Sequence, residues 1–270
     1  MKTLAFLLFA CAAFAQNRQP DVVNAQFETR TFSGDLGSQI RAGSATWFGY
    51  EVKSKRHTGD SCCDRCRLER SHEQVSARPS RPVPLEGSDA IALLYRVEGN
   101  AIQKIQVHSL ACPLDAGGLP FVWLSGVPAR ASASFLKKLV TSNTADHLAH
   151  AAIFALSQHD DPAAITMLED LARPPQAAHV RGQAIFWLAQ EAGSRAAAFI
   201  RGAIENDPDT EVKKKAVFAL SQLPKDEGVP KLIEVAQENR NPEVRKQAFF
   251  WLGQSNDPRA LAFIEQVLSR

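Results

Sequence analysis

Apolar residues in the C-terminal half of the chain recur at a fixed interval, which is the strongest pattern in the sequence. Four segments align without gaps at a spacing of 32 residues; they are residues 148–158, 180–190, 212–222 and 244–254. Within each segment the apolar positions fall at i, i+4, i+5 and i+8, on one face of an α-helix. The i+4 residue is small and lets another helix approach closely. In the four copies it is Ala152, Ala184, Ala216 and Ala248.

A second helix is predicted after each of these segments. Its aligned apolar positions are Leu168, Ile200, Leu232 and Ile264. Its predicted starts are Asp161-Pro162, Gly193-Ser194, Asp226 and Asp257-Pro258. Aspartate before proline is a good N-cap followed by a good first helical residue. Since one helical hairpin cannot bury its apolar face alone, residues 132–270 are predicted to be an α-solenoid of stacked hairpins.

The first helices carry a pattern of valine, arginine, alanine and leucine-glycine that resembles the short bacterial HEAT repeats of the bilin-lyase type. The copy with Val244-Arg245, Ala248 and Leu252-Gly253 matches this pattern most closely, and Val180-Arg181, Ala184 and Leu188 follow it. The resemblance covers roughly half of the chain. It implies a HEAT-like α-solenoid that binds other macromolecules.

Some proteins with this repeat are chromophore lyases or di-iron hydroxylases. The hydroxylases need paired His-Glu motifs across the repeats, whereas His72-Glu73 lies outside the repeats of this chain. The repeat histidines do not have that pattern; they are His147, His150, His159 and His179. We therefore expect no metal and no cofactor, and a bilin-lyase-type enzyme remains a lesser alternative that rests on fold analogy.

Each first helix has a phenylalanine six places after its first apolar residue. The four are Phe154, Phe186, Phe218 and Phe250, and Trp187 and Trp251 stand next to two of them. This position points away from the apolar face, so the six residues are candidate partner-binding residues, because aromatic side chains dominate binding hot spots. The sequence favours the other interpretation, in which each phenylalanine packs against the neighbouring repeat and belongs to the core.

Basic residues also align across the repeats. Arg181, Lys213 and Arg245 share one position, with Lys214, Lys215 and Lys246 beside them. An anionic partner is one interpretation. The sequence favours the other, in which these cations pair with acids such as Asp207, Glu211 or Glu243 and hold neighbouring repeats in register.

Residues 16–131 do not show the repeat and are predicted to form a small β-rich domain. The expected strands are residues 45–52, 91–97, 102–107 and 121–124. The second and third of them alternate in polarity across Glu98-Gly99-Asn100, which is typical of a hairpin. The predicted fold class is therefore α+β, with the β-rich domain before the solenoid.

Four cysteines follow the first fifteen residues, and all lie in the β-rich half: Cys62, Cys63, Cys66 and Cys112. An even number in an exported chain favours disulfides, with Cys112 joined to the 62–66 cluster. A structural zinc site, with His57 or His72, and a thiol-redox centre are the alternatives.

Residues 1–15 have the layout of a secretory signal peptide. Lys2 precedes a short apolar run, and Ala13-Phe14-Ala15 has small residues at the two positions that signal peptidase reads. The run is too short to cross a bilayer, and no other segment is predicted to be transmembrane. We expect a periplasmic or secreted protein, with lipid anchoring at Cys11 as a less favoured alternative.

Charge and motifs narrow the function. The chain has 270 residues, with 31 Lys+Arg against 29 Asp+Glu, and this near balance argues against a nucleic-acid-binding protein. No phosphate-binding loop, zinc-protease motif or nucleophile elbow is present. We therefore expect a non-catalytic exported scaffold that binds a protein or peptide through the solenoid, with a thiol-redox or zinc-binding module in the N-terminal half as the alternative.

Overall fold

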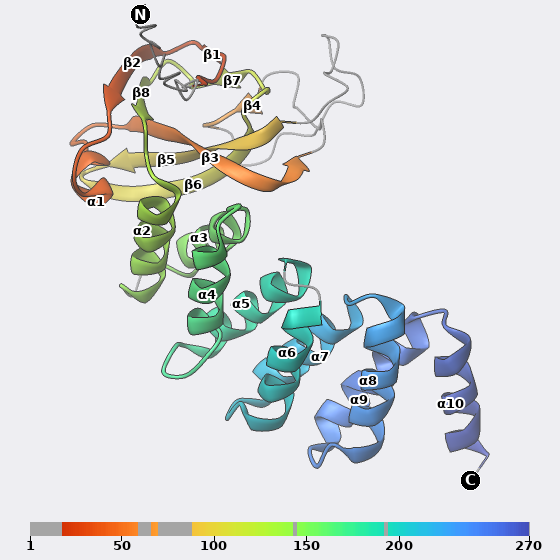
Figure 1. The fold of residues 1–270 in the computed structure, drawn as a ribbon. Helices are drawn as coiled ribbons and strands as arrows, with labels where there is room; N and C mark the ends of the chain where they lie inside the picture. The colour runs from red at the N-terminus through yellow and green to blue at the C-terminus, as the bar shows by residue number, and fades with distance from the viewer. Residues whose placement is uncertain (1–17, 59–65, 70–87, 143–144, 192–193, 270) are drawn as a thin grey trace, which may run out of the picture.

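The computed structural model describes residues 18–58, 66–69, 88–142, 145–191 and 194–269. A β-rich region comes first and a stack of paired helices follows it, which confirms the α+β prediction (Figure 1). The signal peptide, Cys62 and Cys63 lie outside the described residues. No helix within those ranges has the length and hydropathy that a membrane crossing requires.

The central sheet has five strands in the order β2-β8-β3-β5-β6. Their bounds are Gln26–Thr31 for β2, Pro120–Ser125 for β8, Thr46–Thr58 for β3, Ser88–Glu98 for β5 and Ala101–Ser109 for β6. Strand β8 runs parallel to both β2 and β3, and the other pairs are antiparallel. The predicted hairpin joins β5 to β6 through Gly99 and Asn100, which both have positive φ. Strand β2 was missed because its side chains are exposed and show no alternation.

Both faces of the central strands β8, β3 and β5 are buried, so the β-rich region has a larger core than its sequence suggests. Side chains alternate along β5, with Leu93 and Tyr95 facing the helices and Ala92 and Leu94 facing away from them. The far face is covered by a small sheet of β1 (Val22–Val23), β7 (Leu114–Asp115) and β4 (Cys66–Arg67). At Gly49 in β3, an added Cβ would lie 2.6 Å from a methyl carbon of Leu94 and 3.1 Å from the ring of Trp123, so a larger residue requires these buried side chains to shift.

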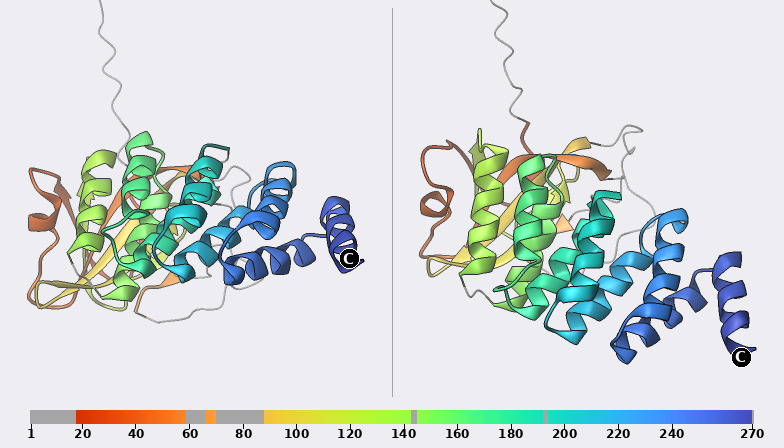
Figure 2. Two further views of the ribbon diagram at one scale, coloured as in Figure 1. Left: turned by 90° about the horizontal axis from the view of Figure 1, so that it is seen from below. Right: turned by 60° about the horizontal axis from the view of Figure 1, so that its bottom comes forward.

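The helices alternate between two layers. After the short helix α1 (Leu36–Gln39), the first-helix layer contains α3 (Asp146–Ser157), α5 (Ala178–Glu191), α7 (Thr210–Ser221) and α9 (Pro242–Gln254). The second-helix layer contains α2 (Ala129–Thr141), α4 (Pro162–Leu171), α6 (Ser194–Asn206), α8 (Lys225–Glu238) and α10 (Pro258–Leu268). Each second helix packs against the first helix of the next repeat, as α8 does on α9, and the stack extends away from the sheet (Figure 2).

The predicted helix starts are correct except at α8. Asp161 and Asp257 cap α4 and α10, and their side chains accept hydrogen bonds from backbone N–H groups of the first turn. Helix α6 begins at Ser194. Helix α8 instead begins at Lys225 with Pro224 as its N-cap, so Asp226 lies within the first turn. An aspartate in the first turn stabilises the helix because its negative charge lies near the positive end of the helix dipole, and here it makes no capping hydrogen bond.

One buried ion pair joins neighbouring repeats. Arg181 on α5 donates two hydrogen bonds of 2.7 Å to the carboxylate of Asp207, in the turn between α6 and α7. Each residue is 6% exposed. Burial is the largest single influence on the pKa of Asp207 and raises it. The hydrogen bonds from Arg181 and from the Asp209 N–H, with the positive charges of Arg181 and Lys213, together outweigh burial and hold this pKa below its usual range.

The other cations of this column contact backbone oxygens. Lys213 Nζ donates to the carbonyl oxygen of Glu205 at 2.7 Å, and Arg245 Nη1 donates to that of Asn239 at 2.7 Å. Both oxygens lie at the C-terminal end of the preceding second helix, where backbone acceptors have no helical partner. Two of the predicted acidic partners are therefore present, Asp207 for Arg181 and Glu211 for Lys214, whereas Lys213 and Arg245 contact backbone oxygens.

Arg181→Met is expected to lower the free energy of unfolding by about 3–5 kcal/mol, because it leaves the Asp207 carboxylate buried and unpaired. Arg245→Met is the matched control; it removes a cation from the same column, leaves no buried charge and is expected to cost about 1 kcal/mol. Urea denaturation of both variants measures the difference. Equal losses would contradict a special role for the buried pair.

A chain of buried hydroxyl groups connects the sheet to the first helices. Tyr50 on β3 lies 2.8 Å from Tyr95 on β5 and 2.8 Å from Ser132 on α2, measured between side-chain oxygens. Ser132 Oγ in turn lies 2.8 Å from His159 Nε2, just after α3. All four side chains are at most 1% exposed. Burial raises the pKa of both tyrosines, so both phenols stay protonated.

The direction of every hydrogen bond in this chain follows from one carbonyl group. His159 Nδ1 lies 2.8 Å from the backbone oxygen of Ala155, which only accepts, so Nδ1 carries the proton. Nε2 of the neutral ring then accepts from Ser132, which accepts from Tyr50, which accepts from Tyr95. A proton on Nε2 would reverse this order. Burial also lowers the pKa of His159, which favours the same neutral form.

Stability is expected to fall as the pH drops through about 6.5, the ordinary pKa of an unfolded imidazole. Below that value His159 becomes protonated in the unfolded chain but stays neutral in the folded chain. The free energy of unfolding therefore falls with pH until the lower pKa of the folded state is reached. Each such imidazole contributes a slope of up to about 1.4 kcal/mol per pH unit. His108, whose pKa burial lowers to about 4, adds to the same trend.

Denaturation at several pH values between about 7.5 and about 5, which brackets the ordinary histidine pKa, tests this prediction. His159→Gln retains an acceptor for Ser132 and cannot titrate, so it should reduce the slope. The matched change His147→Gln makes the same substitution at an exposed position at the start of α3 and is the control. An unchanged slope in His159→Gln would contradict the assignment.

Candidate functional site

The six aromatic residues predicted to bind a partner form one continuous run, which we call the aromatic ladder. Four ring contacts join successive members, from Phe154 to Trp187 (4.9 Å between centroids), Phe186 to Trp187 (5.0 Å), Phe186 to Phe218 (5.7 Å) and Phe218 to Trp251 (4.7 Å). A fifth contact of 4.9 Å joins Trp251 to Phe250. The ladder therefore crosses all four first helices without a break.

Alternation of tryptophan and alanine makes the ladder continuous. The position after each phenylalanine is alanine in the first and third repeats and tryptophan in the second and fourth. Trp187 and Trp251 each contact the phenylalanine of the preceding repeat, whereas Ala155 and Ala219 are fully buried. The direct contact between Phe186 and Phe218 joins the second repeat to the third.

The ladder lies at the boundary between core and solvent. Phe250 is 54% exposed, whereas the other five aromatic side chains are half-buried. The rings thus combine features of the two interpretations of the sequence, packing between repeats and exposure to a partner. One edge of a ring packs against a neighbouring repeat, and the other edge faces water. The indole N–H groups of Trp187 and Trp251 are buried and have no hydrogen-bond partner among the described residues.

Two polar columns flank the ladder, one helical turn away on either side. Four residues before the phenylalanines stand His150, Gly182, Lys214 and Lys246. The position at Gly182 is covered by Lys215, whose Cδ would lie 2.4 Å from an added Cβ. His150 makes an edge contact of 5.9 Å with His179. This side of the ladder is therefore rich in nitrogen donors.

The other column consists of glutamines, which the sequence reasoning did not recognise. Four residues after the phenylalanines stand Gln158, Gln190, Gln222 and Gln254. Gln158 is buried and Gln222 and Gln254 are exposed, so the column opens toward the C-terminal end of the stack. The sequence does contain a signal for this column, because glutamine recurs at the same position in all four repeats. The basic column, in contrast, mixes arginine and lysine.

The predicted cysteine site is only partly described. Cys66 and Cys112 are buried in the same core beneath the sheet. Cys66 pairs with Leu114 across β4 and β7, two residues beyond Cys112. The structure thus brings Cys66 close to the residues that follow β6, which include Cys112. Cys62, Cys63 and His72 lie outside the described residues, and disulfide pairing stays a prediction.

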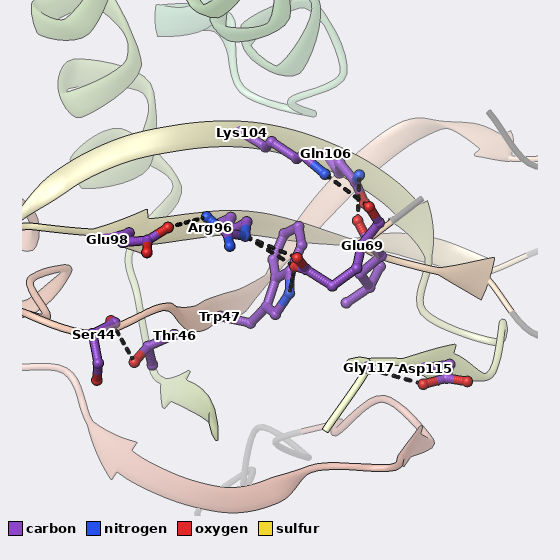
Figure 3. Close-up of polar contacts among 11 residues, drawn as sticks. Ser44, Thr46, Trp47, Glu69, Arg96, Glu98, Lys104, Gln106, Asp115 and Gly117 are labelled. Atoms are coloured by element: carbon purple, nitrogen blue, oxygen red, sulfur yellow. Dashed lines mark hydrogen bonds and ion pairs between the residues drawn. The ribbon is translucent and has the colours of Figure 1, made fainter. Parts of the chain in front are cut away.

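Glu69 fixes the segment after Cys66 onto the sheet (Figure 3). Its carboxylate accepts from Trp47 Nε1 at 2.8 Å and from Arg96 Nε at 3.0 Å. Lys104 Nζ donates to the backbone oxygen of Glu69 at 3.2 Å, and Gln106 donates to that of Leu68 at 3.3 Å. Side chains from three strands therefore hold this short segment in place.

The pair Ser132–His159 has the donor and acceptor types of a nucleophile and its base, but its burial argues for a structural role. Grooves occur on the second-helix layer instead. One of about 320 Å³ lies between α4 and α6 and includes Arg173, stacked 5.0 Å over Phe199. Another lies between α6 and α8 and is lined by ionic side chains such as Arg201, Lys231 and Glu234.

Two solved structures are similar to this chain. The complex of CpcE and CpcF of phycocyanin lyase from Nostoc sp. PCC7120 is 18% identical over 52% of this chain and 91% of that chain, with a TM-score of 0.42. Human deoxyhypusine hydroxylase in complex with glycerol is 20% identical over 54% and 58% of the two chains, with a TM-score of 0.32. Both TM-scores lie below 0.5, so neither likeness bears on function.

A family model provides the clearer comparison. No curated protein matches the sequence of this chain. Residues 196–270 match the model of the HEAT repeats, over α6 to α10. The 32-residue period continues the same helical unit back to α3. Residues 196–270 are therefore HEAT repeats, as the resemblance in the sequence implied.

Proposed function

We propose that this protein is a non-catalytic scaffold that binds an extended peptide segment of a partner protein along the aromatic ladder. The observation that carries the proposal is the unbroken contact of six aromatic rings across four repeats, each with an edge toward solvent. Aromatic side chains lose little conformational freedom on binding and supply much of the energy at protein interfaces. A HEAT solenoid is compatible with this role because its surface is extended and modular.

The two flanking columns suggest how such a peptide is held. Glutamine amides both donate and accept hydrogen bonds, which suits a main chain whose N–H and C=O groups alternate. The lysines on the other side favour carboxylates in the peptide. Four helices at spacings of about 8–10 Å span about 27 Å, which an extended chain covers in about eight residues. The proposed ligand is thus a short acidic segment with apolar side chains.

Peptides selected from a random display library on the intact protein provide the probe. Phe250→Ala and Gln222→Ala/Gln254→Ala should each weaken their binding about tenfold, because a lost aromatic contact or two lost hydrogen bonds costs about 1.4 kcal/mol. Fluorescence anisotropy measures the affinity. Phe27→Ala is the matched control, since Phe27 is an exposed phenylalanine on β2 and should not affect binding. Selected peptides that bind all four proteins equally would refute the ladder as the site.

We further propose that the protein is exported and that its cysteines form disulfides. Support comes from the signal-peptide layout of residues 1–15 and from the burial of Cys66 and Cys112 beneath the sheet. Burial favours a structural role for these two over a thiol-redox centre, which requires an accessible thiolate.

Intact mass after alkylation, with and without prior reduction, tests the disulfide proposal. Unreduced protein should take up fewer alkyl groups than reduced protein, and reduction should lower the free energy of unfolding by about 2–4 kcal/mol. Native mass spectrometry before and after chelation separates a bound zinc from a disulfide. Full alkylation of the cysteines without reduction would overturn the proposal.

A further inference from the structure

Strand β2 forms one edge of the central sheet and lacks the protection that edge strands commonly have. All of its residues, Gln26–Thr31, are exposed, and its pairing with β8 continues without a bulge. It contains no proline and no lysine, which often keep an edge strand from pairing with another chain. The other edge strand, β6, is contacted by α3, contains Lys104 and has a shifted register with β5. Of the two edges, β2 is therefore the one that is open to a further strand.

The backbone groups of β2 that face away from the sheet belong to its odd-numbered residues. Phe32 N–H donates to the Ser125 carbonyl oxygen at 2.8 Å, and the Arg30 carbonyl oxygen accepts from Ser125 Oγ at 3.3 Å. Even-numbered residues thus direct their backbone groups toward β8. Because this direction alternates along a strand, the N–H and C=O groups of Thr29 and of its odd-numbered neighbours point outward. Within the described chain, no backbone group pairs with them.

The charges on β2 define the antiparallel strand that fits this edge. Glu28 accepts hydrogen bonds of 2.7 and 2.8 Å from Arg30, on the same face of the strand. An added strand is favoured when it places a base opposite Glu28 and an acid opposite Arg30, because opposite charges across strands stabilise a pair and like charges destabilise it. In its own direction, such an antiparallel strand has the order acid, middle residue, base. Glu28-Thr29-Arg30 has this order, so β2 of a second copy complements β2.

Backbone direction and charge together select one register for two β2 strands. The outward-facing residues have to pair with one another, so the register changes only in steps of two residues. With Thr29 opposite Thr29, each Glu28 lies opposite Arg30 of the other copy, in a non-hydrogen-bonded pair whose side chains are close. One step in either direction places Glu28 opposite Glu28 or Arg30 opposite Arg30. The favourable register therefore has a two-fold axis at Thr29.

We propose that β2 is a self-association strand, through which two copies of this chain pair antiparallel about Thr29 and join their central sheets into one. The contact is isologous and closes after two subunits, because each copy uses the same open edge. Helices α5 to α10 extend away from β2, so the aromatic ladder of each copy stays accessible (Figure 1). This association goes beyond peptide binding and does not depend on it.

Sedimentation velocity of the full chain over a range of concentrations, with charge reversals on β2, tests the proposal. The wild-type protein should sediment as a dimer that dissociates on dilution. Glu28→Arg and Arg30→Glu should each weaken dimerisation about tenfold, because either change places like charges opposite each other at two symmetry-related positions. The double variant Glu28→Arg/Arg30→Glu exchanges the two charges and should dimerise like the wild type.

Glu243→Arg is the matched control, since it makes the same charge change at an exposed position of α9 and should leave the dimer intact. Circular dichroism checks that each variant keeps the wild-type fold. A wild-type protein that is monomeric at all concentrations would overturn the proposal. So would a dimer that both single reversals leave unchanged, or a double variant that stays monomeric.

Cysteine substitution tests the register directly. Thr29→Cys should form a disulfide with its copy under oxidising conditions, because directly opposite residues in a hydrogen-bonded pair have Cα atoms about 5.5 Å apart. Thr31→Cys is the control, since its copy lies four residues along the strand, about 13 Å away. Covalent dimer is measured by intact mass without reduction, with the wild-type protein as the background from its own cysteines. Equal cross-linking of the two variants would contradict the axis at Thr29.

Discussion

Burial between consecutive repeats is the interaction on which the rest of this structure depends. A pair of helices of this length exposes more apolar surface than it hides, so each pair is stable only when another pair covers it. The buried alanines of the first helices allow that approach, and the long aliphatic residues of the second helices fill the space beneath. Since every junction has to satisfy the same constraint, the same residue types return every 32 positions. The aromatic ladder and its flanking columns are secondary results of this repetition, because equivalent positions on stacked helices necessarily lie in rows.

At the N-terminal end of the stack, the sheet rather than another hairpin covers the apolar face of the first helical pair. Its inner face provides the apolar cover that a preceding hairpin would provide, and its tyrosines supply polar contacts that a hairpin lacks. The hydroxyl chain from Tyr95 to His159 is fully satisfied only in one direction and in one protonation state. A satisfied buried network of this kind specifies one arrangement of its elements, because any shift leaves a donor or acceptor unpaired in a region of low dielectric constant.

The solenoid could be predicted from the sequence, because the helical period and the turns of each repeat are visible as local patterns of residues. It was also sufficient to place Phe154, Phe186, Phe218 and Phe250 in one row, although the ring contacts through Trp187 and Trp251 depend on side-chain directions that no period reveals. Contacts between segments that are distant in the sequence could not be predicted in this way. Glu69 meets Trp47 and Arg96 only because β4 lies across the sheet, and Ser132 meets His159 only because α2 and the end of α3 converge there. The glutamine column was visible in the sequence, but polar residues at a helix end are commonly solvated, and only the geometry relates them to the ladder.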